Sequence, residues 1–147
     1  MKFPSRVLII DEDKGIRNLL RASLSSQEYA IEGAATGRDG LHKAAVNPPE
    51  VFLIELSLPD MDGLQVIRRL RKWTAMPIIV ISEREKETDK VEALEIGPDD
   101  YVTKPFGVPE LLARIRLALH YANKLQRSDN QRVIKTVKRP PPGLDRR

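Results

Sequence analysis

Five polar residues follow directly after short apolar runs of the sequence: Asp11, Glu12, Glu55, Ser82 and Lys104. Three of them carry carboxylates, one a hydroxyl and one an ammonium group. Clustered carboxylates repel one another unless a hard cation or a lysine neutralises them. Oxygen ligands suit Mg²⁺, and a neighbouring hydroxyl and ammonium group could hold the oxygens of a phosphoryl group. If these side chains meet, we expect chemistry at phosphate.

The apolar pattern predicts the elements that would position these residues. Short runs rich in β-branched residues predict five buried strands, at residues 7–10, 29–34, 51–54, 78–81 and 101–103. Apolar residues at helical spacing predict five helices, around residues 16–24, 39–46, 64–70, 91–94 and 108–119. Strands that alternate with helices imply an α/β fold, a doubly wound parallel sheet covered on both faces.

The order of the strands decides which polar side chains can meet, because open α/β sheets bind ligands beyond the carboxyl ends of their strands. In the order 2-1-3-4-5, the first and third strands are neighbours. This order would place Asp11, Glu12 and Glu55 at one rim, with Ser82 and Lys104 beside them. Loops carry polar residues in any protein. Five polar residues that each lie at the carboxyl end of a predicted strand nevertheless favour a functional site.

The composition argues against several other functions. The chain has no cysteine, and its two histidines, His42 and His120, are far apart. Thiolate zinc sites and cysteine nucleophiles are therefore excluded, and we expect no enzymatic activity. No apolar run approaches the roughly 18 residues that span a membrane, and no signal-peptide pattern is present. These features predict a cytoplasmic protein without membrane contact.

Four segments resemble the receiver (response regulatory) domain of two-component response regulators. They are VLIIDED (7–13), LIELSLPDMDG (53–63), PIIVIS (77–82) and GPDDYVTKPF (97–106), and the resemblance covers about residues 5–123. The segments DKVEAL and ELLARIRLAL are similar to the OmpR/PhoB subfamily of transcription regulators, and KPFGVPEL is most similar to KdpE-like regulators of potassium-transport operons. The resemblance implies a flavodoxin-like (CheY-like) fold, a place in phosphorelay signal transduction and a sensor histidine kinase as partner.

The resemblance implies a metal and phosphoacceptor site with three departures from the family pattern. Asp11 and Glu12 match the acidic pair that binds Mg²⁺, and Glu55, the third expected ligand, replaces the phosphoacceptor aspartate. Glutamate reaches about 1.5 Å further, and a misplacement of about 1 Å can cost about 100-fold in rate. Glu12 also replaces a usual aspartate, and Glu83 adds negative charge. We therefore expect weakened Mg²⁺ binding and little or no phosphorylation.

The resemblance assigns switch roles to residues around that site. Ser82 matches the hydroxyl that moves toward the phosphoryl group, and Tyr101 matches the aromatic that rotates inward with it. Lys104 matches the lysine that pairs with the phosphoryl group. Pro105 matches a proline that follows a cis peptide bond.

Three interpretations of Glu55 are open at this point. A partial phosphomimic would bias the switch toward its active form, although glutamate has one charge and two oxygens where phosphate has close to two charges and three terminal oxygens. An inactive site would keep the fold alone. A residual Mg²⁺-dependent switch would still phosphorylate Glu55, Asp60 or another carboxylate. The first two describe a pseudo-receiver that binds partners or dimerises without phosphorylation.

The OmpR/PhoB resemblance also implies a homodimer through the fourth helix, fifth strand and fifth helix. The charged residues expected on this face are Lys90, Asp99, Asp100, Glu110 and Arg114. Tyr121 stands where the basic partner of Asp99 usually lies, so the third ion pair is doubtful. Exposed pairs contribute about 0–1 kcal/mol each, so they would specify the partner more than drive association.

The end of the chain differs from the rest in charge. Residues 126–147 hold seven Lys or Arg and two Asp. Residues 1–125 hold eighteen Lys or Arg and nineteen Asp or Glu, so the two charges nearly balance there. We expect a receiver domain over residues 5–125 and a basic, disordered tail over 126–147. The tail shows no helix-turn-helix pattern, so we expect no winged-helix effector domain and DNA binding only where one is supplied. Weak nucleic-acid binding by the tail is an alternative, without aromatic residues for stacking.

Overall fold

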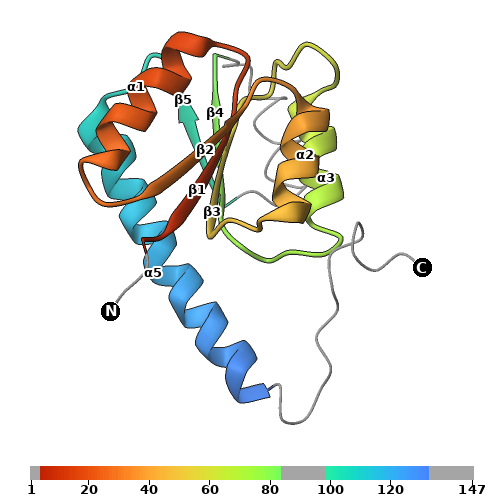
Figure 1. The fold of residues 1–147 in the computed structure, drawn as a ribbon, viewed down its shortest axis with the longest axis vertical. Coiled ribbons are helices and arrows are strands. Elements are labelled where there is room, and N and C mark those ends of the chain that lie inside the picture. The colour runs from red at the N-terminus through yellow and green to blue at the C-terminus, as the bar shows by residue number, and fades with distance from the viewer. Residues whose placement is uncertain (1–3, 84–98, 133–147) are drawn as a thin grey trace.

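A five-stranded parallel sheet in the order β2-β1-β3-β4-β5 forms the centre of the computed structural model (Figure 1). The structure describes residues 4–83 and 99–132, with side chains described up to Lys124. The strands are β1 Arg6–Ile10, β2 Ala30–Ala34, β3 Val51–Ile54, β4 Ile78–Ser82 and β5 Asp100–Thr103. The helices are α1 Lys14–Ser25, α2 Gly37–Val46, α3 Gly63–Leu70 and α5 Val108–Arg132. The predicted doubly wound, flavodoxin-like (CheY-like) sheet is confirmed.

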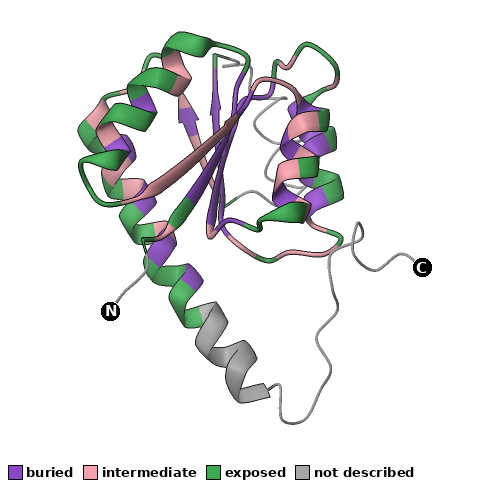
Figure 2. Cartoon of the chain, viewed as in Figure 1, coloured by how far each residue is buried: buried purple, intermediate pink, exposed green. Residues whose placement is uncertain are grey.

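Two apolar cores lie on opposite faces of the sheet. Successive residues of a strand point to opposite faces, so Leu8 and Ile10 of β1 enter one core while Val7 and Ile9 enter the other. Helices α2 and α3 cover the first face, and α1 and α5 cover the second (Figure 1). The central strands β1, β3 and β4 are buried almost throughout, whereas the edge strands β2 and β5 are mostly half-buried, and many of the exposed residues lie on the helices (Figure 2). This burial fixes the register of each strand and hence the residue at its carboxyl end.

Side-chain caps start three of the helices that follow the strands. Asp13 accepts hydrogen bonds from the amides of Gly15 and Ile16, Thr36 from Asp39, and Asp62 from Leu64. Such caps satisfy amides that have no partner inside the helix and favour helix formation by about 1 kcal/mol. The connections from β1 to α1 and from β2 to α2 are short, whereas residues 55–62 form a longer connection from β3 to α3.

One expected helix lies outside the described residues, and another helix is longer than expected. The helix expected around residues 91–94 falls in 84–98, outside the described residues, so the described part has four helices. Helix α5 continues past the expected domain end at 125 to Arg132. Gln and Arg in this stretch are good helix formers, whereas Ser128, Asp129 and Asn130 are not, so helix propensity alone does not explain the extension. None of the described helices is long and apolar enough to cross a membrane.

Gly63, the first residue of α3, packs closely against the backbone that follows β3. A Cβ at Gly63 would lie 2.4 Å from the carbonyl oxygen of Glu55 and 2.7 Å from Cα of Leu56. Because both are backbone atoms, they cannot move aside alone, and Gly63→Ala is expected to lower the free energy of unfolding by about 1–3 kcal/mol. Urea denaturation measures it.

Gly107 gives the matched control, because no atom lies within 4 Å of a Cβ built there. Gly107→Ala should change the free energy of unfolding by less than about 1 kcal/mol. Equal losses in the two variants would contradict the packing assigned to Gly63.

Candidate functional site

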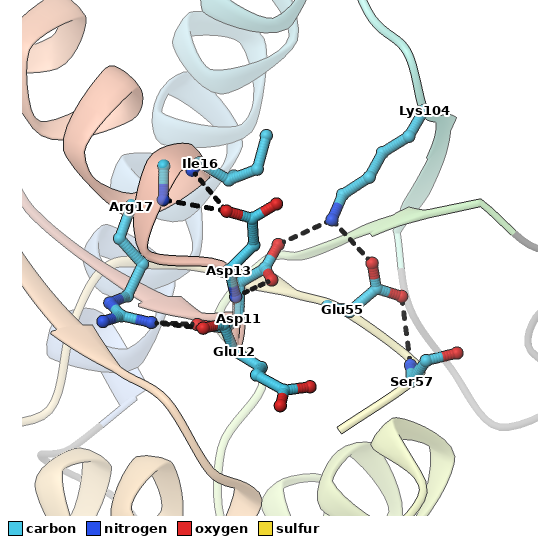
Figure 3. A network of polar contacts seen from close by, with 9 residues as sticks. Asp11, Glu12, Asp13, Ile16, Arg17, Glu55, Ser57 and Lys104 are labelled. Carbon is cyan, nitrogen blue, oxygen red and sulfur yellow. Dashed lines mark hydrogen bonds and ion pairs between the residues drawn. The ribbon is translucent and has the colours of Figure 1, made fainter. Parts of the chain in front are cut away.

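Asp11, Glu55 and Lys104 meet at one rim of the sheet, each directly after the carboxyl end of a strand (Figure 3). They follow β1, β3 and β5 respectively. Lys104 Nζ lies 2.8 Å from Asp11 Oδ2 and 2.7 Å from Glu55 Oε1. Strands β1 and β3 are neighbours, so the residues that follow Ile10 and Ile54 are adjacent. The ammonium group therefore bridges two carboxylates that would otherwise repel each other. This part of the sequence-based site is brought together as expected.

Both carboxylates are almost completely buried, with Asp11 1% and Glu55 5% exposed. Glu55 Oε2 accepts a hydrogen bond of 3.0 Å from the amide of Ser57. Each oxygen of Glu55 thus has a partner, one an ammonium group and the other a backbone amide. Buried charges with such partners are tolerated, whereas a buried charge without one is strongly destabilising.

Arg17 and Asp13 hold the acidic loop in place. The Arg17 guanidinium donates hydrogen bonds to the carbonyl oxygens of Asp11 and Glu12, at 2.7 and 2.9 Å. The amide of Asp13 donates to Asp11 Oδ1 at 2.9 Å. Sequence reasoning missed Arg17, although its position in the first turn of α1, close to the acidic run, was a usable signal. Asp13 serves as a helix cap.

The metal site expected from Asp11, Glu12 and Glu55 is not assembled as a set. Glu12 borders the same surface cavity as Asp11, Glu55 and Lys104, but no contact joins its carboxylate to Lys104 or Glu55 in Figure 3. Within residues 4–83 and 99–124, no group of three or more His, Cys, Asp or Glu side chains is placed to hold a metal ion. Lys104 occupies one oxygen of Asp11 and one of Glu55. The oxygen donors have the chemistry that Mg²⁺ prefers, but their arrangement here fits an ammonium group.

The electrostatics of Lys104 follow from its neighbours. Burial lowers the pKa of Lys104, but hydrogen bonds and charge interactions with Asp11 and Glu55 outweigh this and raise the pKa above its usual value. The side chain is 12% exposed. Lys104 is therefore a permanent cation at neutral pH.

The residues expected to switch lie beside this network. Ser82 ends β4 and is fully buried, and its carbonyl oxygen accepts a hydrogen bond of 2.8 Å from the Lys104 amide. The Lys104–Pro105 peptide bond is cis. Tyr101 is half-buried and packs against the core that α2 and α3 cover. The hydroxyl, the lysine and the aromatic residue thus share the β4–β5 edge of the site.

Residues 7–116 match the family described as the response regulator receiver domain. The chain belongs to this family. The matched range contains all of β1 except Arg6, the strands β2 to β5 and every residue of the site described above. The expected resemblance is therefore confirmed.

Curated relatives of this receiver include transcriptional regulators. It is 45% identical over 115 residues to the KDP operon transcriptional regulatory protein KdpE of Escherichia coli K12, covering 78% of this chain and 51% of that protein. It is 45% identical over 130 residues to the transcriptional regulatory protein KdpE of Mycobacterium tuberculosis, covering 88% and 57%. The receiver thus spans about half the length of these relatives.

Solved structures support the same fold. A CheY-like receiver domain from Methanospirillum hungatei superimposes with a TM-score of 0.79 at 29% identity, covering 82% of this chain and 98% of that one. The BeF3-activated receiver domain of Klebsiella pneumoniae RstA gives a TM-score of 0.75 at 26% identity, covering 78% and 98%.

The charged residues expected on a dimer face make ion pairs inside the receiver. Arg114 lies 2.8 Å from Asp100 and 3.0 Å from Glu110. Asp99 pairs with Arg71 at 2.8 Å and accepts the amide of Ile78 at 2.8 Å. Sequence reasoning missed Arg71, which no motif or spacing links to Asp99.

Lys90, the remaining member of the expected face, lies outside the described residues. The charged residues of this face that the structure describes are therefore engaged in ion pairs within the chain.

Lys104→Met tests the neutralisation of the two carboxylates. Removing the ammonium group leaves Asp11 and Glu55 buried side by side without a cation, so we expect a loss of about 3–5 kcal/mol in the free energy of unfolding at pH 7. Lys43→Met is the control, because Lys43 pairs with the exposed Asp39 at 3.1 Å. That pair should contribute less than about 1 kcal/mol. Comparable losses of unfolding free energy in Lys104→Met and Lys43→Met would contradict the role of Lys104 in neutralising Asp11 and Glu55.

The pH dependence follows from the raised pKa of Lys104. Its stabilising contribution is fully present below 10.5, the ordinary pKa, and is lost as the pH rises through the higher pKa of the folded protein. The stability difference between wild type and Lys104→Met should therefore be constant near neutrality and shrink above pH 10.5. Urea denaturation of both proteins across this range measures it.

Proposed function

We propose that the chain is the receiver module of a KdpE-like response regulator that acts without phosphorylation of residue 55. One contact carries the proposal: Glu55 Oε1 lies 2.7 Å from Lys104 Nζ. The lysine is thus paired to residue 55 in the protein as it folds, without a phosphoryl group. The output would be protein contact, by homodimerisation or by binding to another signalling protein.

The length of the glutamate side chain supports this proposal. One extra methylene moves the carboxylate about 1.5 Å from the place where an aspartate would end. Phosphoryl transfer requires the attacking and leaving oxygens in line, and a misplacement of about 1 Å can reduce the rate about 100-fold. In this position both oxygens are also engaged, by Lys104 and by the Ser57 amide. Attack by Glu55 would have to break one of these contacts.

The geometry favours a partial phosphomimic over an inactive site. A carboxylate that reaches the ammonium group of Lys104 makes one of the contacts that a phosphoryl group would make. It supplies one negative charge, compared with close to two on a phosphoryl group. We therefore propose a bias toward the active form that is weaker than phosphorylation would give.

Another carboxylate, Asp60, is a poor replacement acceptor. Its two oxygens accept hydrogen bonds from the amides of Gly37 and Arg38 at the start of α2, at 2.8 and 2.9 Å. These bonds hold the pKa of Asp60 below its usual value. Asp60 therefore serves the start of α2 and lies outside the Lys104 network.

The partners of the module are proposed from its family. Receivers of two-component systems interact with sensor kinases, and a sensor histidine kinase is the proposed upstream partner. The KdpE relatives are named as transcriptional regulators, but this chain spans about half their length. DNA binding is therefore proposed only where a further effector domain is supplied. We propose a cytoplasmic, non-enzymatic role.

Weak Mg²⁺ binding forms part of the proposal. A metal ion at the rim would compete with Lys104 for Asp11 and Glu55, and Glu12 would have to turn toward it. Mg²⁺ demands near-ideal octahedral geometry and dehydrates reluctantly, so it accommodates displaced ligands poorly.

Phosphorylation is tested by intact mass after incubation with a small phosphodonor and Mg²⁺. The wild-type chain should gain no phosphoryl group, because Glu55 is displaced and already paired. Glu55→Asp should gain one, because it restores the shorter carboxylate at a rim that keeps Lys104 and Ser82. Asp60→Asn in the Glu55→Asp background is the control and should leave that gain intact.

A phosphoryl group on the wild-type chain would overturn the proposal and favour the residual phosphoacceptor. Peptide mapping of the modified chain would then identify the acceptor. Light scattering of the unphosphorylated wild type and Glu55→Asp separates the mimic from the inactive site. A mimic predicts more dimer in the wild type, whereas an inactive site predicts equal amounts.

Competition between Lys104 and Mg²⁺ is tested by calorimetric titration. Lys104→Met should bind Mg²⁺ more tightly than the wild type, because the ammonium group no longer occupies Asp11 and Glu55. Asp11→Asn in the same background should abolish the gain by removing a carboxylate ligand. Equal affinities for wild type and Lys104→Met would show that the lysine does not compete.

A further inference from the structure

Strand β2 lies at one edge of the sheet, so one of its sides has no neighbouring strand. Successive residues of a parallel strand direct their amide and carbonyl groups to opposite sides of the strand. The carbonyl oxygen of Ala34 accepts a hydrogen bond from the amide of Asp11, so Ala34 faces β1. Gly33 and Ile31 alternate with it and therefore direct their backbone groups to the open side. Such an edge can pair with a strand of another chain.

Lys43, in the last turn of α2, closes part of this open side. Its Nζ donates a hydrogen bond of 2.6 Å to the carbonyl oxygen of Gly33. The same ammonium group lies 3.1 Å from Oδ2 of Asp39, one turn earlier on α2. The carboxylate thus holds the lysine in the orientation in which it reaches the strand. A backbone acceptor on the open side is therefore already occupied within the chain.

Two arginine side chains of α1 lie against Gly33 from the other helical layer. A Cβ built on Gly33 would lie 3.2 Å from Arg17 Cδ and 3.3 Å from Arg21 Nη2. Arg17 continues from there to the carbonyl oxygens of Asp11 and Glu12. The absence of a side chain at Gly33 leaves the room that these arginines use. Long cationic side chains from both layers therefore meet at the same residue of β2.

The position of Lys43 is not explained by its own helix or by stability. A cation in the last turn of a helix is favoured by the unpaired carbonyl groups there. The Lys43 ammonium group donates instead to a strand residue ten positions earlier in the chain. Water could bind the Gly33 carbonyl on this open side, and an exposed pair such as Lys43 and Asp39 contributes little to stability. What the lysine changes is which other groups can reach the strand.

We propose that Lys43 blocks the open edge of β2 and so prevents a second copy of the chain from pairing with it strand to strand. Strand addition is held together by main-chain hydrogen bonds, and the outward carbonyl of Gly33 would have to accept one of them. Lysine side chains at sheet edges are a known means of preventing such pairing. The inference goes beyond the proposed function, because it concerns the edge of the sheet that lies opposite β5.

Sedimentation velocity of the full chain tests the role of the Lys43 ammonium group. Lys43→Met keeps the apolar stem but removes the donor, so this variant should self-associate at concentrations about tenfold lower than the wild type, as expected when each copy regains one acceptor. Lys43→Arg keeps a donor and should behave like the wild type. Lys72→Met is the matched control, because it removes an equal charge from an exposed position after α3.

Amide hydrogen exchange shows whether the new association uses the β2 edge. Pairing at this edge would engage the outward amides of Ile31 and Gly33, so their exchange should slow in the associated Lys43→Met variant. Association through another surface would leave the exchange of both amides unchanged. Urea denaturation of Lys43→Met and Lys72→Met should give similar free energies of unfolding, which shows that unfolded chains do not cause the association.

A Lys43→Met variant that associates no more than the wild type would overturn the inference. Equal association of Lys43→Arg or Lys72→Met, or association without protection of the Ile31 and Gly33 amides, would overturn it as well. None of these results alters the intact-mass experiment on Glu55. Failure of the edge blocking is therefore distinguishable from failure of the phosphorylation-independent function.

Discussion

The contact between Lys104 and two buried carboxylates is the constraint on which the functional rim depends. Asp11 and Glu55 lie on neighbouring strands and are nearly inaccessible to water, so they require a positive charge between them. Lys104 provides it from the end of β5, at 2.8 and 2.7 Å. The same contact explains why a metal ion would have to compete for these ligands and why residue 55 has a partner without phosphorylation.

The site at the sheet rim lies at the carboxyl ends of β4 and β5, and the charged residues expected on a dimer face lie toward the amino ends of the same strands. Lys104 follows the carboxyl end of β5 and hydrogen bonds to the carbonyl of Ser82, the last residue of β4. At the amino ends of the same strands, Arg71 and Asp99 hold the backbone of Ile78 in place. Strands β4 and β5 pair in parallel along this edge. A rigid element therefore connects the phosphoacceptor position with the expected dimer face.

Family membership explains the architecture, and Glu55 is the residue on which the proposed function rests. The match over residues 7–116 and the identity of 45% to KdpE proteins place the receiver firmly. The Glu55 carboxylate reaches the Lys104 ammonium group directly. A single methylene thus changes the chemistry proposed for the site without disturbing the sheet, because the change lies beyond the carboxyl end of β3.

The sheet, its two covering layers and the residues at the strand ends could be predicted from the sequence, because a sheet that is covered on both faces demands apolar runs in its strands. Asp11, Glu55 and Lys104 were predictable for that reason. The folded structure was needed to show that Glu12 stays outside the Lys104 contacts, that Arg17 holds the acidic loop and that Arg71 pairs with Asp99. These contacts depend on side-chain direction and join residues on different elements. Local periodicity carries no information about either property.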